Sequence, residues 1–199
     1  MRVIGGKFRS RSLLAPVGWQ TRPTSDRLRE TLMNVLENGA VNRVRGANLL
    51  DLFAGTGAVG IEALSRSAQS VTFVEQDAKA MTLLEANCAR LGLTREVRRV
   101  RASVASWLRH AAASATQAGS FDLVFLDPPW NDAEAYTQTL GELSAQAAHL
   151  LARDAWVVAE HSRKFSLAEQ FGCLMRWRVL EQGDASLSFY QRTVGIAEE

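Results

Sequence analysis

The sequence predicts an α/β protein with a doubly wound, mostly parallel sheet of seven strands and a small N-terminal extension made of a β-hairpin and a helix. Three observations favour this class. Short apolar runs alternate with longer amphipathic runs between residues 47 and 160, the first apolar run enters a glycine-rich turn, and two further runs flank a turn near the C-terminal end. Such alternation is typical of parallel strands joined by helices that cover both faces of a sheet.

The N-terminal extension has its own pattern. Residues 1–15 alternate loosely in hydrophobicity and contain a Gly-Gly pair, which favours a short hairpin, and residues 16–23 are expected to form a loop. Residues 24–26, Thr-Ser-Asp, can all cap a helix, and apolar side chains on one face predict that this helix continues to about Glu37. The Asn-Gly pair at 38–39 should end it.

The remaining elements follow from the change between strand-like and helix-like periodicity. Strands are expected at 47–53, 70–75, 97–101, 121–126 and 155–160. Helices are expected at 58–67, 77–91, 104–112 and 133–151. The segments 174–180 and 186–192, on either side of a Gln-Gly-Asp turn, predict a closing antiparallel hairpin.

Positive charge is concentrated before the predicted sheet. Residues 1–45 hold nine basic and three acidic side chains, a local balance of +6 against +2 for the whole chain. Of the 23 basic residues in the chain 20 are arginine, whose guanidinium group suits bidentate phosphate contacts and stacking. We therefore expect residues 1–45 to form a basic extension that contacts nucleic acid and residues 46–199 to form the α/β domain. The expected contacts include Lys7, Arg9, Arg11 and Arg22.

Composition sets further expectations. A chain of 199 residues that is 47% hydrophobic can bury one sizeable core, and we expect it to be a monomer. No apolar stretch approaches the length of a membrane span, and charges stand near the N-terminus where a signal peptide needs apolar residues, so a cytoplasmic protein with no membrane partner is predicted. Cys88 and Cys173 are the two cysteines, and no Cys/His cluster has the spacing of metal ligands, which predicts a reduced, metal-free protein.

The run Asp127-Pro128-Pro129-Trp130 directly follows the strand predicted at 121–126, at the end where open α/β sheets do their chemistry. If the substrate is a planar exocyclic amine, its nitrogen must leave the ring plane while other groups accept its hydrogens. Asp127 and a backbone carbonyl of the Pro-Pro segment could accept them, because proline leaves carbonyls without helical or sheet partners. Trp130 could stack on the base. A plain strand followed by a proline turn is the structural alternative.

A second motif is the run Leu49 to Gly60, in which a strand enters a glycine-rich turn and then a helix. Glycines at positions 55, 57 and 60 match the dinucleotide fingerprint, and Glu75 follows at the end of the next strand, placed to bond ribose hydroxyls. A nicotinamide or flavin enzyme is therefore a rival interpretation. Asp51, four residues before Gly55, would face the amino-acid end of a ligand better than a pyrophosphate, which favours a zwitterionic nucleoside bearing a sulfonium group.

These two motifs resemble known ones. Asp51-Leu-Phe-Ala-Gly-Thr-Gly57 resembles motif I of class I S-adenosylmethionine-dependent methyltransferases, and Asp127-Pro-Pro-Trp130 resembles the motif of those that methylate exocyclic amino nitrogens. Together with the blocks at 2–11, 21–30 and 62–66, nearly the whole chain is similar to the bacterial RsmD family, the guanine-N2 methyltransferases of 16S ribosomal RNA. Trp130 stands where Tyr or Phe is more usual, and Ala102-Ser103 stands where many methyltransferases place Asp or Asn beside the adenine.

The resemblance implies a site and a reaction. Its cofactor residues would be Asp51, Phe53, Ala54, Gly55, Thr56, Gly57, Glu75, Gln76 and Ser103, and its catalytic residues would be Asp127, Pro128, Pro129 and Trp130. The methyl group of S-adenosylmethionine would pass to the N2 amine of a guanine in 16S ribosomal RNA, either free or within an assembled or assembling small subunit. The base would have to be unpaired or extruded from its helix.

Three alternatives remain open on the sequence. A DNA amino methyltransferase acting on adenine N6 or cytosine N4 would use the same Asp-Pro-Pro-aromatic chemistry, although 199 residues leave little room for a target-recognition domain. A nicotinamide-dependent oxidoreductase would share the glycine turn but would give Asp127-Pro-Pro-Trp130 no role. A catalytically silent RNA-binding module would be expected not to bind the methyl donor.

Overall fold

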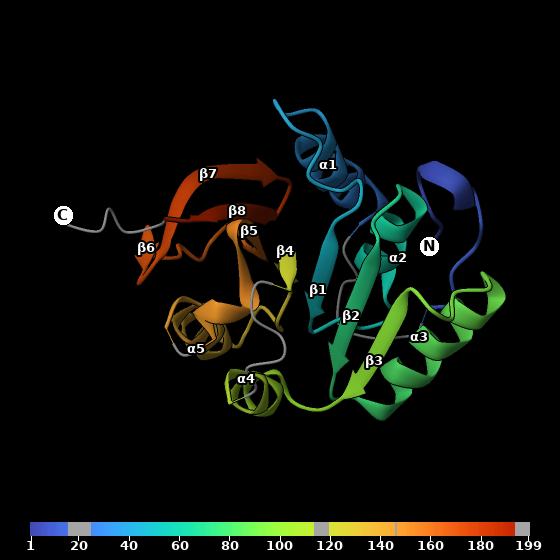
Figure 1. The fold of residues 1–199 in the computed structure, drawn as a ribbon. Coiled ribbons are helices and arrows are strands. Elements are labelled where there is room, and N and C mark those ends of the chain that lie inside the picture. Colours follow the sequence, from blue (N-terminus) through green and yellow to red (C-terminus); the bar gives the residue numbers. More distant parts are fainter. Residues whose placement is uncertain (16–24, 114–119, 146, 194–199) are drawn as a thin grey trace. The chain divides into compact units, whose positions relative to one another are not determined.

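The structure is a computed structural model that describes residues 1–15, 25–113, 120–145 and 147–193 (Figure 1). The loop predicted at 16–23, and with it Arg22, lies outside the described residues. The chain divides into two compact units, Met1–Ser103 and Val104–Glu199.

The first unit contains three parallel strands in the order β3-β2-β1. Its elements are η1 (Gly6–Phe8), α1 (Asp26–Glu37), β1 (Asn48–Leu52), α2 (Ala58–Ser65), β2 (Ser70–Glu75), α3 (Ala78–Arg90) and β3 (Val97–Arg101). Apolar side chains of the strands, such as Leu50, Leu52 and Phe73, are fully buried, and α3 packs beside β2 and β3 (Figure 1). The predicted alternation of strand and helix is confirmed in this unit.

Capping side chains explain where two of these helices begin. The hydroxyl of Ser25 accepts a hydrogen bond from the N–H of Leu28 at 3.1 Å, so α1 begins within the predicted capping segment. The carboxylate of Asp77 does the same for α3 by accepting from the N–H of Ala80 at 2.7 Å. Both acceptors satisfy N–H groups that have no partner within the first turn of a helix.

Residues 1–15 form a hairpin-like loop rather than a regular hairpin. One antiparallel bridge joins Arg2 and Ser12, and Val3 exchanges backbone hydrogen bonds with Arg11 and Ser10 at 2.9 Å each. Between these arms the chain makes the short 3-10 turn η1. Gly6 has a φ of 70°, and a Cβ there would overlap the backbone of Ser65, so this close approach requires glycine.

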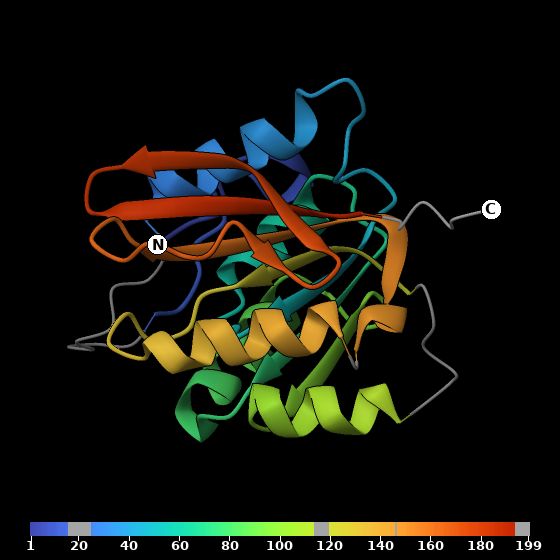
Figure 2. The same cartoon turned by 90° about the vertical axis from the view of Figure 1, so that its left-hand side faces the viewer.

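The second unit combines one parallel and several antiparallel strand pairs in the order β4-β5-β8-β7-β6. Its elements are α4 (Val104–Ala112), β4 (Phe121–Leu126), α5 (Ala133–Ser144), η3 (Ala148–Leu150), β5 (Leu151–Ser162), β6 (Gln170–Phe171), β7 (Leu174–Gln182) and β8 (Ala185–Arg192). Helices α4 and α5 lie side by side (Figure 2). The closing hairpin predicted from the tail is confirmed as β7 and β8.

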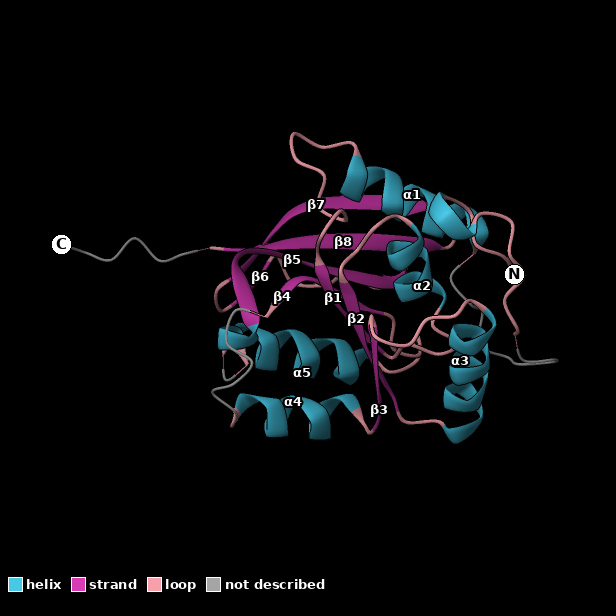
Figure 3. Cartoon of the chain, turned by 45° about the vertical axis from the view of Figure 1, so that its right-hand side comes forward, coloured by secondary structure: helices cyan, strands magenta, loops and turns pink. Residues whose placement is uncertain are grey.

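Two predictions for this unit were wrong in detail. The helix expected at 133–151 ends at Ser144, and β5 begins at Leu151 instead of residue 155. Leu151 pairs with Phe121 of β4 and is fully buried, so pairing with the sheet replaces a helical continuation that local propensity allows. The short strand β6, which lies against α5 (Figure 3), was not predicted because two residues carry no periodic signal; it brings the described strands to eight.

Within the described ranges, no helix is both long enough and apolar enough to cross a membrane.

Candidate functional site

The glycine turn after β1 has an unusual backbone. Phe53, Gly55 and Gly57 have φ values of 58°, 55° and 80°. Bulky residues rarely adopt positive φ, and strain of this kind persists where the surrounding structure holds it. Here the N–H of Ala54 donates to the carbonyl of Val74 at 3.1 Å, which ties the turn to β2. The N–H of Gly57 donates to the carbonyl of Ala54 at 2.8 Å, so hydrogen bonds hold the turn in this conformation.

The three glycines of the fingerprint have different surroundings. A Cβ at Gly60 would overlap the ring of Phe73, so this glycine allows α2 to pack closely on β2. A Cβ at Gly57 would lie 3.1 Å from a side-chain carbon of Leu84. A Cβ at Gly55 would meet no atom within 4 Å, which leaves open space beside this part of the turn. Gly55 is thus the position at which a ligand could approach the backbone.

Glu75, at the end of β2, is joined to the glycine turn. Its carboxylate accepts hydrogen bonds from the N–H of Gly55 at 2.7 Å and from the N–H of Asp77 at 2.8 Å. Each carboxylate oxygen retains acceptor capacity after these bonds. The sequence suggested a ligand contact for Glu75, and the structure adds a second role, in which this buried side chain fixes the turn.

Asp51 is buried in β1 and its carboxylate accepts a hydrogen bond from the N–H of Gly60 at 3.0 Å. Burial raises the pKa of Asp51 to about 8; the negative charge of Glu75 acts in the same direction and the hydrogen bond from Gly60 opposes it. At neutral pH the carboxyl group is therefore mostly protonated. A cation placed beside it would favour the ionised form.

The other predicted cofactor residues differ in exposure. Phe53, Ala54 and Ser103 are partly exposed, Thr56 is buried and Gln76 is exposed. The backbone of Thr56 contacts a residue that the sequence interpretation missed. The fully buried Asn87 of α3 donates to the carbonyl of Thr56 at 3.1 Å and exchanges two hydrogen bonds with the backbone of Leu14, at 2.7 and 3.1 Å. Asn87 thereby joins the N-terminal segment to the glycine turn.

In the second unit, the Asp-Pro-Pro-Trp segment directly follows β4. Asp127 and Trp130 are partly exposed, Pro128 is buried and Pro129 is exposed. The carbonyl of Pro129 accepts from the N–H of Asp132 at 2.8 Å, and the carboxylate of Asp132 caps α5. The segment is therefore a closed turn that leads directly into a helix.

Tyr136 of α5 also holds this turn, and nothing in its sequence context singled it out. Its hydroxyl oxygen lies 3.2 Å from the carbonyl oxygen of Pro128 and 3.0 Å from that of Glu160 in β5. Its ring packs against Phe165 and against His161, with centroid distances of 5.6 and 6.3 Å. A single buried side chain thus joins the turn after β4 to the end of β5.

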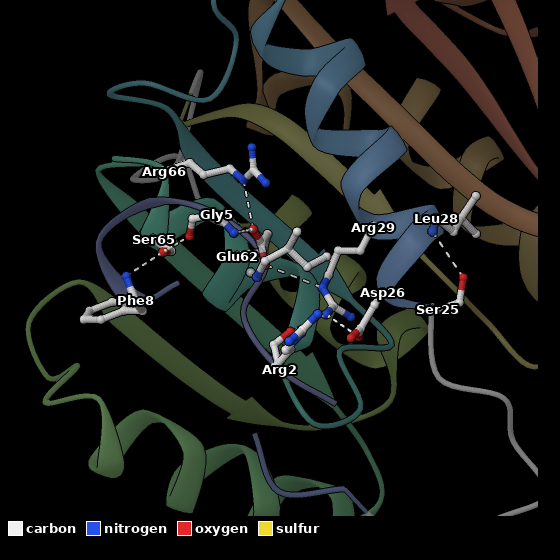
Figure 4. Close-up of polar contacts among 12 residues, drawn as sticks. Arg2, Gly5, Phe8, Ser25, Asp26, Leu28, Arg29, Glu62, Ser65 and Arg66 are labelled. Atoms are coloured by element: carbon white, nitrogen blue, oxygen red, sulfur yellow. Dashed lines mark hydrogen bonds and ion pairs between the residues drawn. The ribbon is translucent and has the colours of Figure 1, made fainter. Parts of the chain in front are cut away.

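The basic N-terminal segment is held by a buried cluster of charged and polar side chains (Figure 4). The carboxylate of Glu62 accepts from the N–H groups of Ile4 and Gly5 at 2.8 Å each, and the hydroxyl of Ser65 accepts from the N–H of Phe8 at 2.9 Å. The buried Arg29 donates to the carbonyl of Arg2 at 2.6 Å. These hydrogen bonds hold the backbone of the N-terminal segment in place.

The side chains of Lys7, Arg9 and Arg11 are exposed, whereas their neighbours Val3 and Leu13 are buried. A fixed backbone that carries exposed basic side chains is suited to contact phosphates, and these residues belong to the first unit. In the part of the chain that the structure describes, no group of three or more His, Cys, Asp or Glu residues could hold a metal ion.

Comparison with known proteins identifies the family. The family model described as "Conserved hypothetical protein 95" matches residues 1–191. The chain belongs to this family. The resemblance to the RsmD family is thereby confirmed, and two curated relatives agree with it. "Putative rRNA methyltransferase YlbH" of Bacillus subtilis is 35% identical over 194 residues, which cover 96% of this chain and 99% of that protein. "Ribosomal RNA small subunit methyltransferase D" of Escherichia coli K12 is 40% identical over 130 residues, which cover 65% of this chain and 60% of that protein.

Solved structures confirm the fold class. The "Putative methyltransferase yhhF from Escherichia coli" superposes with a TM-score of 0.79 and 33% identity, covering 96% of this chain and 97% of that one. "SMU.776, a putative methyltransferase complexed with SAH" has a TM-score of 0.64 and 16% identity, covering 82% of this chain and 49% of that one, a likeness that concerns the fold alone. This member of the RsmD family has the class I methyltransferase fold.

Proposed function

We propose that this protein methylates ribosomal RNA with S-adenosylmethionine, and that its target is the exocyclic N2 amine of a guanine in the small-subunit RNA. The observation that carries the proposal is the intact Asp127-Pro128-Pro129-Trp130 turn after β4, in a chain whose relatives are named as methyltransferases of ribosomal RNA. An acid, a backbone carbonyl with acceptor capacity and an aromatic ring are the groups that an exocyclic amine requires.

The first unit would bind the cofactor. The open space beside Gly55 suits a nucleoside with an amino-acid tail, and Phe53, Ala54, Thr56 and Gly57 belong to the same turn. Asp51 would serve the ammonium end, and Glu75 would serve the ribose while it holds the turn. Gln76 and Ser103 would complete the contacts. A structural neighbour of the same fold was solved with S-adenosylhomocysteine, the product of the donor.

The reaction requires no covalent nucleophile from the protein. S-adenosylmethionine would supply a methyl group made reactive by its sulfonium, and this group would pass directly to the amine nitrogen while sulfur keeps the electron pair of the broken bond. The amine must release a proton, and Asp127 is the group that would accept it. Trp130 would hold the base by stacking. The protein would thus contribute orientation, exclusion of water and acceptance of the amine hydrogens.

RNA recognition would rest on residues 1–45, with residues 46–199 as the methyltransferase domain. Lys7, Arg9 and Arg11 are exposed on a fixed backbone, and Arg22, outside the described residues, would extend the same charge. Phosphate contacts of this kind position an enzyme on RNA without reading its bases. We propose that the protein acts as a monomer, in the cytoplasm and without a metal, on 16S ribosomal RNA that is free or part of a small subunit.

Mass-spectrometric mapping of methylated nucleosides in ribosomal RNA from a deletion strain would test this function. We expect one N2-methylguanosine in 16S RNA to disappear and to return when the wild-type gene is restored, but not when Asp127→Ala is supplied. Unchanged ribosomal RNA with loss of N6-methyladenine or N4-methylcytosine from DNA would instead identify a DNA amino methyltransferase. Binding of NAD but not of S-adenosylhomocysteine in calorimetry would identify an oxidoreductase.

A further inference from the structure

The carbonyls of the two prolines in the Asp-Pro-Pro-Trp turn have different hydrogen-bond partners. The carbonyl of Pro129 closes the turn by accepting from the N–H of Asp132 at 2.8 Å. The carbonyl of Pro128 receives the hydroxyl of Tyr136 at 3.2 Å. Because Pro128 follows Asp127 directly, its carbonyl belongs to the residue next to the proposed proton acceptor. A carbonyl oxygen has two lone pairs, so the bond from Tyr136 leaves one available.

The hydroxyl of Tyr136 is shared between two carbonyls. The hydroxyl oxygen lies 3.2 Å from the oxygen of Pro128 and 3.0 Å from that of Glu160, and it has one hydrogen to donate. Glu160 belongs to β5, which pairs in parallel with β4 from Leu123↔Trp156 to Leu126↔Ala159. The hydroxyl therefore connects the turn that follows β4 to the adjoining part of the neighbouring strand, and it limits how far the Pro128 carbonyl can rotate.

The surroundings of Tyr136 keep this side chain in one place and in one protonation state. Tyr136 is fully buried, and Phe165 and His161 pack against its ring. Burial raises the pKa of its hydroxyl above the usual range, and the negative charges of Asp127, Glu160 and Asp132 add to this effect. The hydroxyl therefore remains a neutral hydrogen-bond donor at every pH at which the enzyme would work.

From these contacts we propose that Tyr136 is a positioning residue for methyl transfer: its hydroxyl holds the Pro128 carbonyl so that the carbonyl's remaining lone pair can accept a hydrogen of the target amine. This inference rests on the proposed function and deepens it. Tyr136 does not touch the substrate in this scheme. It acts through Pro128, and its loss should therefore affect the chemical step more than the binding of cofactor or RNA.

Tyr136→Phe tests the inference, because it removes the hydroxyl and keeps the ring. We expect kcat for methylation of the RNA substrate to fall by about tenfold or more, as misplacement of a catalytic group does, while the KM for S-adenosylmethionine changes by less than about twofold. Hydrogen exchange measured by mass spectrometry should show faster exchange at Asp132 and Ala135, whose N–H groups close the turn and cap α5.

Tyr190→Phe is the matched control. Tyr190 is another fully buried tyrosine of the second unit, and its hydroxyl donates to the carbonyl of Ala168 at 2.7 Å, away from the Asp-Pro-Pro-Trp segment in sequence. Each variant removes a tyrosine hydroxyl that donates to backbone carbonyl oxygen, so both should unfold at a lower temperature. Only Tyr136→Phe should lose kcat and show faster exchange at Asp132.

The possible results separate this inference from the proposed function. A Tyr136→Phe enzyme with the kcat of wild type, or a loss of kcat that Tyr190→Phe matches, would overturn the positioning role. If the wild-type protein methylates no ribosomal RNA, the proposed function fails, but hydrogen exchange still tests the contact. Unchanged exchange at Asp132 in Tyr136→Phe would then show that the hydroxyl does not hold the turn.

Discussion

Glu75 and Gly55 are joined by a hydrogen bond of 2.7 Å from the glycine N–H to the carboxylate, although 20 residues separate them in the chain. The bond connects the end of β2 to the turn that follows β1. The same carboxylate accepts from Asp77, which caps α3. Glu75 therefore organises the turn, in addition to the ribose contact that its place in the sequence suggests.

Glu75→Ala should weaken S-adenosylhomocysteine binding strongly, by about tenfold or more, because it removes both the proposed ribose contact and the acceptor that holds Gly55. Isothermal titration calorimetry would measure the change. Glu85→Ala removes an exposed acid from the neighbouring helix α3 and should bind like wild type. Equal affinity of Glu75→Ala and wild type would remove Glu75 from the cofactor site.

The raised pKa of Asp51 predicts that cofactor binding releases a proton. Its pKa is raised to about 8 in the free protein, so near pH 7 most molecules carry the proton. An ammonium group bound beside it would lower this pKa and expel the proton. Affinity for S-adenosylhomocysteine should therefore rise with pH up to about 8 and then level off. Calorimetry at pH 7 in buffers of different ionisation enthalpy should detect the released proton in wild type and not in Asp51→Asn.

The raised pKa of Asp51 also predicts how the stability of the folded protein depends on pH. A carboxyl whose folded-state pKa is raised binds its proton more tightly in the folded protein than in the unfolded chain, so its contribution falls as pH rises from the unfolded value near 4 to about 8. Asp51→Asn cannot ionise. The unfolding temperature of Asp51→Asn, relative to that of wild type, should rise from pH 4 to pH 8 and should not rise further above pH 8. A constant difference between the two proteins over this interval would contradict the raised pKa.

Asp127→Ala should lower methyl transfer by about a hundredfold or more and leave cofactor affinity nearly unchanged, because Asp127 would act on the amine in the transition state. Trp130→Phe should keep much of the activity, since it preserves an aromatic face, and Trp130→Ala should keep little. Single-turnover rates with the RNA substrate would measure these effects. Full activity in Trp130→Ala would exclude stacking from the mechanism.

The basic extension predicts a salt-dependent effect that a single substitution would test weakly. Changing Lys7, Arg9, Arg11 and Arg22 together to Ala should weaken RNA binding and flatten its salt dependence by on the order of one unit of log-log slope for each lost phosphate contact. Cofactor binding should not change. Filter binding across a salt titration would measure the slope.

A control variant can remove the same charge elsewhere. Arg90, Arg109, Arg153 and Lys164 are exposed and lie outside residues 1–45. Changing these four together to Ala should alter the slope less. If both quadruple variants lose RNA binding equally, general positive charge and not the extension attracts the RNA.

Local sequence patterns predicted most of the described elements, because strand and helix periodicity depend on neighbouring residues. The strand from Ser70 to Glu75 and the helix from Val104 to Ala112 begin and end where expected. The prediction was wrong where a residue that is distant in sequence determines the local structure. Helix α5 ends at Ser144, and Leu151, within the predicted helix, pairs instead with Phe121 of β4.

The motifs of the site were equally visible in the sequence, since the glycine turn and the Asp-Pro-Pro-Trp segment are contiguous. Their supporting contacts were not. Asn87 reaches Leu14 across 73 positions, and Tyr136 reaches Glu160 across 24. The raised pKa of Asp51 likewise depends on burial that no local pattern reports. The sequence by itself determined which groups could do the chemistry; the tertiary structure decided how they are held and charged, because hydrogen bonding and desolvation depend on atoms that only folding brings together.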